Sequence, residues 1–134
     1  MYQLPIRVYI EDTDAGGIVY HSCYLNYMER ARSEWMRSRG YEHRQAVSED
    51  FLLVVASVKI DYLRPALMDD LLCVGVEPLR LGKASVLLRQ QVWREAQLLA
   101  SAEVRLACVT ASTKRLRSLP ESVLQELNSS LTPG

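Results

Sequence analysis

One stretch of the chain repeats its apolar residues at the spacing of an α-helix. Residues 22–39 carry apolar side chains three or four positions apart, with charged residues between them: Tyr24, Met28, Ala31 and Trp35. Ser22 is a suitable N-cap for this helix, and Gly40 is a suitable C-terminal stop. Leu25, Tyr27 and Met36 widen the apolar stripe. The pattern therefore predicts a central helix that other elements cover on more than one side.

Most of the remaining chain alternates apolar and polar residues as β-strands do. The pattern predicts strands over residues 7–10, 51–63, 71–76, 84–94 and 98–110. Short polar segments separate the last four strands, which suggests hairpin-like connections between them. Residues 41–50 are predicted to form a loop, residues 120–128 a short helix, and residues 129–134 a frayed tail.

These elements predict an α+β fold in a single domain over residues 1–134. Long antiparallel strands that follow one apolar helix favour a curved sheet of about five strands wrapped around the helix at residues 22–39. A chain of 134 residues is long enough to bury a substantial core without disulfides or a structural metal.

The charge balance argues against several partner classes. Sixteen Lys and Arg residues match sixteen Asp and Glu residues, and the pI is about 6.7. The chain therefore offers no bulk attraction for nucleic acid or for an anionic membrane. No apolar run approaches the roughly 18 residues of a membrane span, so we expect a soluble, cytoplasmic protein without membrane insertion. Its three cysteines are expected to be reduced core residues.

The connection between the first predicted strand and the central helix carries candidate chemistry. It places Asp12 and Asp14 just before the pair Gly16 and Gly17. Glycines let the backbone turn tightly and let a ligand approach closely, and a helix start offers free N–H groups to an anionic oxygen. Aspartates before glycines also form ordinary turns, so both a structural turn and an acyl-transfer site fit this spacing.

The same region resembles a known enzyme family. The matching residues are Tyr9, Asp12, Thr13, Asp14, Gly17, Val19, Tyr20, His21, Tyr24, Leu25, Tyr27, Glu29, Arg30, Ala31 and Arg32. Together they resemble the signature of hot-dog-fold acyl-CoA thioesterases, in the branch of 4-hydroxybenzoyl-CoA thioesterase and the Tol-Pal-associated, YbgC-like group. Residues 59–70 and 102–104 resemble the same group, so the likeness covers nearly the whole chain.

The resemblance implies a role for each residue of the connection. Asp14 would be the catalytic carboxylate, acting as nucleophile or as general base toward water. The backbone N–H of His21, at the helix start, would hold the carbonyl oxygen of the thioester. Gly16 and Gly17 would leave room for the acyl group, and Tyr20 and Tyr24 would line its pocket.

Other residues keep plainer interpretations. Asp12 is expected to shape the turn through local hydrogen bonds. Glu29 is the second-choice carboxylate, although an ion pair on the helix explains it equally well. His21 and Cys23 lack the companion ligands of a metal site, so we expect no metal, and the implied reaction requires no cofactor.

The resemblance also implies partners. The substrate would be an acyl-CoA, with acyl carrier protein as an alternative carrier, and the sequence leaves the acyl group open between aromatic and aliphatic. Hot-dog proteins usually form at least homodimers with sites at the interface, and a homotetramer stays open. A rival function is a non-catalytic acyl-CoA or acyl-carrier-protein binding component of an envelope-associated complex. A dehydratase is disfavoured because the chain lacks the family's His-Phe-Pro signature.

Overall fold

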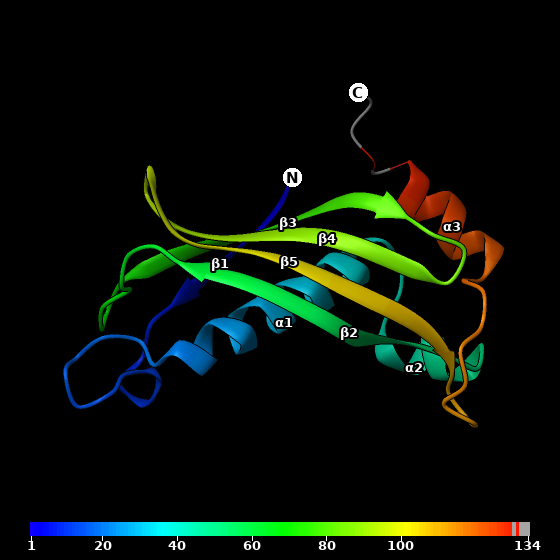
Figure 1. Ribbon diagram of the computed structural model, residues 1–134, viewed down its shortest axis with the longest axis horizontal. Helices are drawn as coiled ribbons and strands as arrows, with labels where there is room; N and C mark the ends of the chain where they lie inside the picture. The colour runs from blue at the N-terminus through cyan, green and yellow to red at the C-terminus, as the bar shows by residue number, and fades with distance from the viewer. Residues whose placement is uncertain (130, 132–134) are drawn as a thin grey trace.

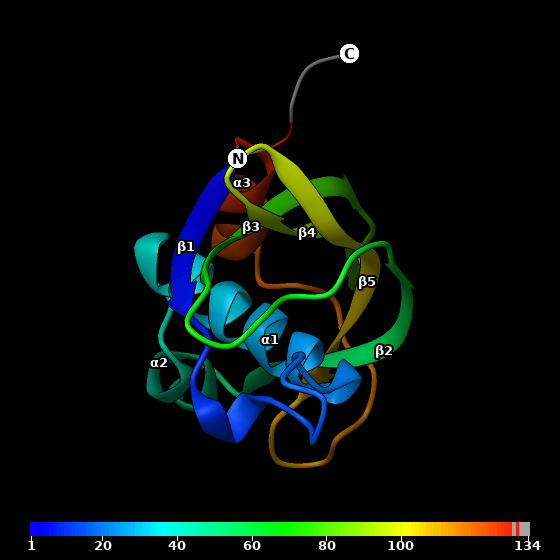
Figure 2. The same cartoon turned by 90° about the vertical axis from the view of Figure 1, so that its left-hand side faces the viewer.

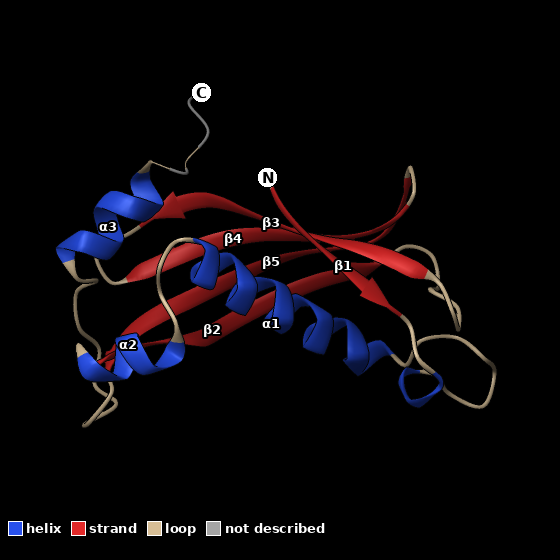
Figure 3. Ribbon diagram, turned by 180° about the vertical axis from the view of Figure 1, so that it is seen from behind, coloured by secondary structure: helices blue, strands red, loops and turns tan. Residues whose placement is uncertain are grey.

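A curved antiparallel sheet wraps around one long helix in the computed structural model (Figures 1 and 2). The structure describes residues 1–129 and 131, apart from the side chains of His43 and Gln45. The central helix α1, His21–Ser38, lies against the concave face of the sheet (Figure 3). The predicted α+β class, with five strands around a central helix, is therefore confirmed.

The remaining elements follow in chain order around this pair of layers. The strands are β1 (Tyr2–Arg7), β2 (Phe51–Tyr62), β3 (Leu71–Leu81), β4 (Ser85–Arg94) and β5 (Gln97–Thr110). The short helices are α2 (His43–Ser48) and α3 (Glu121–Asn128), and Ile10–Asp12 form a 3-10 turn, η1. Helix α3 confirms the predicted C-terminal helix. The predicted fraying of the tail falls largely on residues 130 and 132–134, which lie outside the described residues.

The sheet order is β1-β3-β4-β5-β2, and every pairing is antiparallel. Hairpins join β3 to β4 and β4 to β5, as predicted. The expected hairpin between β2 and β3 is wrong, because β2 pairs with β5 instead, from Phe51 opposite Thr110 to Tyr62 opposite Ala100. The connection from β2 to β3 therefore crosses over, and β1 and β2 are the two edges of the sheet.

Two predictions of local structure are corrected. The first strand ends at Arg7 instead of running over residues 7–10, because the chain turns into η1, where the Tyr9 N–H donates to the Asp12 carboxylate (3.0 Å). Residues 41–50 are not a plain loop, since they contain α2, whose Ala46 packs against the core. Tertiary packing stabilises a helix too short to form alone.

The ends of α1 differ slightly from the prediction. Tyr20, and not Ser22, is the N-cap, because the Cys23 N–H already donates to the carbonyl oxygen of Tyr20 (2.9 Å). The helix ends at Ser38, and Gly40 adopts a φ of +90° just beyond it. Gly40 therefore confirms the predicted stop, since this backbone conformation favours glycine.

The core lies between α1 and the inner face of the sheet. From α1 it takes the buried residues Tyr24, Tyr27, Met28, Ala31 and Trp35. This confirms the predicted stripe and its widening at Tyr27, whereas Leu25 is exposed. The alternating inner residues of β4 are also buried: Val86, Leu88, Gln90 and Val92. The cysteines are free, and Cys108 is buried, whereas Cys23 and Cys73 are only partly buried.

Gln90 is a fully buried polar side chain that joins the sheet to the helix. Its Nε2 donates to the Met28 carbonyl oxygen (2.9 Å), and its Oε1 accepts a hydrogen bond from the Arg32 guanidinium (2.9 Å). Both ends of the amide are therefore satisfied, which burial of a polar group requires. These two hydrogen bonds hold α1 at a fixed distance from β4.

We expect Gln90→Leu to destabilise the fold. The substitution leaves the partly buried Arg32 guanidinium without its acceptor, so the free energy of unfolding should fall by about 1–3 kcal/mol. Urea unfolding followed by circular dichroism measures the change. Gln91→Leu, on the opposite face of β4, is the matched control and should change the free energy of unfolding by less than about 1 kcal/mol. Equal stability of the two variants would contradict the role of Gln90 in joining the helix to the sheet.

Candidate active site

The loop before α1 holds the Asp14 carboxylate in a defined orientation. The Gly16 N–H donates to Asp14 Oδ1 (2.8 Å), and the Gly17 N–H donates to the Asp14 carbonyl oxygen (3.1 Å). A Cβ atom at Gly16 would lie 3.2 Å from Asp14 Oδ1, and Gly17 has a φ of +80°. The glycine pair thus shapes the surroundings of the carboxylate. Gly16 leaves space beside it, and Gly17 closes the turn.

Asp12 has a different environment from Asp14. Its Oδ2 accepts the Tyr9 N–H (3.0 Å), and its carbonyl oxygen accepts the Tyr20 N–H (2.9 Å). These bonds agree with the turn-shaping role expected for Asp12. Burial raises the pKa of the Tyr27 hydroxyl, and the nearby Asp12 carboxylate raises it further. Asp12 is therefore tied into the loop, whereas Asp14 is exposed.

The start of α1 lies directly after this loop and is open. His21 is its first residue, and the N-cap Tyr20 makes no side-chain capping hydrogen bond. The Cys23 N–H already donates to the Tyr20 carbonyl oxygen (2.9 Å), so the N–H groups of His21 and Ser22 are the ones left for an external acceptor, and the helix dipole favours a negative one. The rings of Tyr20 and His21 are exposed and lie 4.3 Å apart between centroids.

Tyr24 is buried beneath the site and does not line an open pocket, contrary to what the resemblance implies. Its hydroxyl accepts the Ala66 N–H (2.9 Å), and burial raises its pKa. Tyr62, at the end of β2, is the residue that the sequence analysis did not select. The Tyr62 hydroxyl donates to the His21 carbonyl oxygen (3.0 Å), and its ring packs edge-on against Tyr24 with centroids 5.2 Å apart. The motif over residues 59–70 was the available signal for Tyr62.

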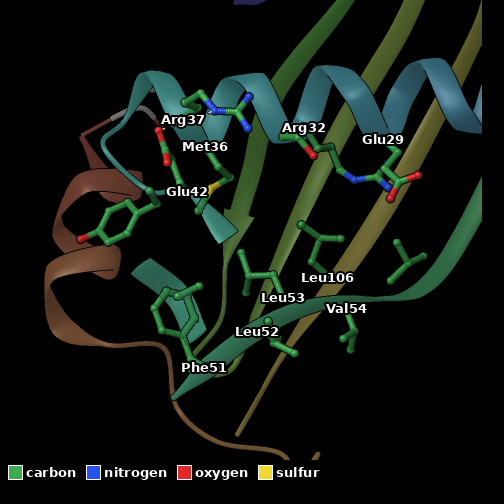
Figure 4. A pocket seen from close by; sticks show the side chains of 14 residues that line it. Glu29, Arg32, Met36, Arg37, Glu42, Phe51, Leu52, Leu53, Val54 and Leu106 are labelled. Atoms are coloured by element: carbon green, nitrogen blue, oxygen red, sulfur yellow. Dashed lines mark ion pairs between the residues drawn. The ribbon is translucent and has the colours of Figure 1, made fainter. Parts of the chain in front are cut away.

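Glu29 lies away from the other candidate residues. It lines a cavity of about 460 Å³ between the second half of α1 and the start of β2 (Figure 4). Asp14 is not among the residues that line this cavity. Burial lowers the pKa of Arg32, the neighbour of Glu29 in the cavity wall, and the charge of Glu29 opposes that shift. The structure therefore joins Asp14 to Gly16 and Gly17 in the loop, and Tyr62 to His21 and Tyr24 at the start of α1, and it places Glu29 in a separate cavity wall.

The cavity combines apolar and charged walls. Figure 4 shows Arg32 and Glu29 on α1 facing Leu53, Leu106 and Val54 across the space. Arg37, which also lines the cavity, forms an ion pair with Glu42 (3.9 Å).

None of the helices in the described part of the chain combines the length and the apolar character needed to cross a membrane.

Comparison with known proteins identifies the class to which this fold and loop belong. The family model of the Thioesterase superfamily matches residues 16–101. The chain is 39% identical over 123 residues to the acyl-CoA thioesterase YbgC of Haemophilus influenzae, a match that covers 91% of this chain and 90% of the relative. It is 36% identical over 127 residues to the acyl-CoA thioester hydrolase YbgC of Escherichia coli, with coverage of 94% and 95%.

The structural comparison agrees. A probable thioesterase from Bartonella henselae matches with a TM-score of 0.83 and 33% identity, covering 88% of this chain and 98% of that one. The fold and the sequence together define an enzyme of the hot-dog thioesterase class. The chain belongs to the Thioesterase superfamily, and the resemblance drawn from its sequence is confirmed.

We expect Gly17→Ala to lower kcat strongly and to lower the free energy of unfolding only slightly. Alanine at a positive φ costs about 1 kcal/mol, and relief of that strain shifts the loop that carries Asp14. A displacement of this kind should lower kcat roughly tenfold or more. Thioester hydrolysis and thermal unfolding measure the two effects.

Gly40→Ala is the matched control for this substitution. Gly40 also has a positive φ, and at both positions an added Cβ meets nothing within 4 Å. Its stability loss should equal that of Gly17→Ala, with kcat unchanged. A common loss of activity in both variants would show that the loop geometry has no special role.

Proposed function

We propose that the enzyme hydrolyses acyl-CoA thioesters with Asp14 as its catalytic carboxylate. The observation that carries the proposal is the exposed Asp14 carboxylate, oriented by the Gly16 N–H (2.8 Å) in the loop that leads into α1, whose N-cap makes no side-chain hydrogen bond. A carboxylate beside free N–H donors supplies both groups that thioester cleavage needs. The printed activity of the YbgC relatives supports the same reaction.

Asp14 can act in two ways, and bonds and protons balance in both. As nucleophile, its oxygen bonds to the thioester carbon, the C–S bond breaks and CoA leaves as thiolate; water then cleaves the mixed anhydride to the free acid. As general base, Asp14 takes a proton from water while the water oxygen attacks the same carbon, and the proton passes to the departing thiolate. In either route the carbonyl oxygen becomes negative and accepts the His21 N–H, a contact worth about 3 kcal/mol in the transition state.

The edge strand β2 supports a homodimer as the working form of the enzyme. Its middle is exposed although it is apolar, with Val54, Val55 and Val58 each 39–47% exposed. An unpaired apolar edge is a template for another strand. Antiparallel pairing of two β2 strands about a twofold axis would close this edge in both copies.

Such pairing would also join two incomplete halves of a site. The end of β2 carries Tyr62 beside the α1 start, whereas its beginning, from Phe51, lines the cavity next to the second half of α1. A twofold axis near the middle of β2 places the cavity of one copy beside Asp14 of the other. The acyl group then extends from the Asp14 loop into the partner's cavity, and Glu29 belongs to its wall instead of the reacting centre.

We expect Asp14→Asn to lose most turnover while it keeps its fold. Asparagine retains an oxygen that accepts the Gly16 N–H, so the loop geometry survives, but it is neither a base nor an anionic nucleophile. Loss of such a group lowers kcat by roughly 10²- to 10⁴-fold. CoA release from a panel of acyl-CoAs measures it, with Glu11→Gln, an exposed neighbouring carboxylate, as control.

Two results would count against this assignment. Near wild-type turnover in Asp14→Asn would remove Asp14 from the reaction. Wild-type protein that binds acyl-CoA but releases no thiol would favour the non-catalytic binding role instead. The same assay with acyl-carrier-protein thioesters tests the alternative carrier. The cytoplasmic location stays a prediction.

We expect charge on the β2 edge to break the dimer and the activity together. Val55→Lys combined with Val58→Lys places like charges across the twofold axis, which is unfavourable in paired strands. Light scattering after size-exclusion chromatography should show monomers, and hydrolysis should fall at least tenfold. Val47→Lys, on exposed α2, is the control. An active monomer would refute the shared site.

A further inference from the structure

The candidate loop rests on a second segment that lies far away in the sequence. Residues 65–70, which we call the backing segment, run between β2 and β3. The Val19 N–H donates to the Ala66 carbonyl oxygen (2.9 Å), and the Met68 N–H donates to that of Gly17 (3.4 Å). An antiparallel bridge joins Ile18 to Leu67 between these bonds. The position of the chain between Asp14 and α1 is therefore set by the backing segment.

The backing segment belongs to no strand, and backbone and side-chain contacts together hold its shape. The Asp69 N–H donates to the Val8 carbonyl oxygen (3.1 Å), and the Arg7 guanidinium donates to the Asp69 carbonyl oxygen (2.8 Å). The Asp70 carboxylate accepts the Leu67 N–H through Oδ2 (2.9 Å) and closes a turn within the segment. The Tyr24 hydroxyl accepts the Ala66 N–H (2.9 Å) from the side of α1. The segment thus depends on side-chain hydrogen bonds as well as on backbone ones.

A single guanidinium clamps both ends of this segment. Arg94, the last residue of β4, donates through Nη1 to Asp70 Oδ2 (2.6 Å) and to the Pro65 carbonyl oxygen (3.3 Å). Its Nη2 donates to Gln97 Oε1 (2.5 Å), which fixes the plane of the guanidinium. The side chains of Arg94 and Asp70 are only 27% and 19% exposed, so water screens their attraction weakly.

We propose that Arg94 is a positioning residue for thioester hydrolysis, which acts through Asp70 and the backing segment to hold the loop that carries Asp14. The chain of contacts runs from Arg94 to Asp70 and Pro65, from there to Ala66 and Met68, and then to Val19 and Gly17. Arg94 touches no reacting atom. The inference rests on the proposed role of Asp14, but the contacts themselves do not.

A second ion pair shows what a purely structural role would look like. Arg89 of β4 pairs with Glu77 of β3 at 3.6 Å, with side chains 43% and 24% exposed. Like Arg94, Arg89 lies on β4 and pairs with an acidic residue, but its partner Glu77 lies within β3 and outside the backing segment. Arg89→Gln is therefore a matched control for Arg94→Gln.

The test compares four variants: Arg94→Gln, Arg94→Lys, Asp70→Asn and Arg89→Gln. We expect Arg94→Gln and Asp70→Asn to lower kcat roughly tenfold with KM changed less than about threefold, because the loop is displaced while the acyl and CoA contacts remain. Arg94→Lys should recover part of the loss, since lysine keeps the charge without the planar fork. Arg89→Gln should keep the wild-type kcat.

Amide hydrogen exchange supplies a readout that does not depend on catalysis. The amides of Val19 and Met68 should exchange at least tenfold faster in Arg94→Gln than in the wild type, and at the wild-type rate in Arg89→Gln. Unchanged exchange at both amides would overturn the proposal, and so would faster exchange with an unchanged kcat. An error in the role of Asp14 would appear separately, as an active Asp14→Asn variant whose loop amides still respond to Arg94.

Discussion

Burial of the apolar stripe of α1 in the concave face of the sheet is the constraint on which the rest of the structure depends. Trp35, Tyr27 and Met28 are among the largest fully buried side chains, and all three lie on this helix. Their burial, with the Gln90 bonds to Met28 and Arg32, fixes both the rotation and the height of the helix. The helix start is thereby held beside the end of β2, where Tyr62 reaches the His21 carbonyl oxygen.

The site combines local and distant contacts. The turn around Asp14 is local, because the hydrogen bonds of Gly16 and Gly17 span only two or three residues. The position of the turn in the molecule depends on contacts that are distant in the sequence. Val19 and Gly17 bond to residues about fifty positions later, and Arg94 supports those residues from a third part of the chain. A carboxylate can be oriented by its neighbours, but the position of the loop that carries it is set by bonds to a segment far away in the sequence.

The sequence predicted the elements with strong periodicity and missed those that depend on packing. The central helix and the alternation of β4 and β5 follow from spacing, because each has one buried face. Helix α2 has only six residues and no periodicity to reveal it. The β2 to β3 connection has the turn residues of a hairpin, but β2 pairs with β5, and the connecting residues bond to the loop before α1 instead.

The sequence by itself determined the thioesterase family, the central helix, the glycine-supported turn and the candidates of that turn, because these depend on residue type and short spacing. The tertiary structure alone decided that Glu29 lies in a separate cavity, that Tyr24 is buried, and that Tyr62 and Arg94 support the same region. The hydrogen bond of Tyr62 to His21 joins residues 41 positions apart, and that of Arg94 to Asp70 joins residues 24 positions apart. Such contacts arise only when the sheet closes around the helix, and no periodic pattern in the chain encodes them.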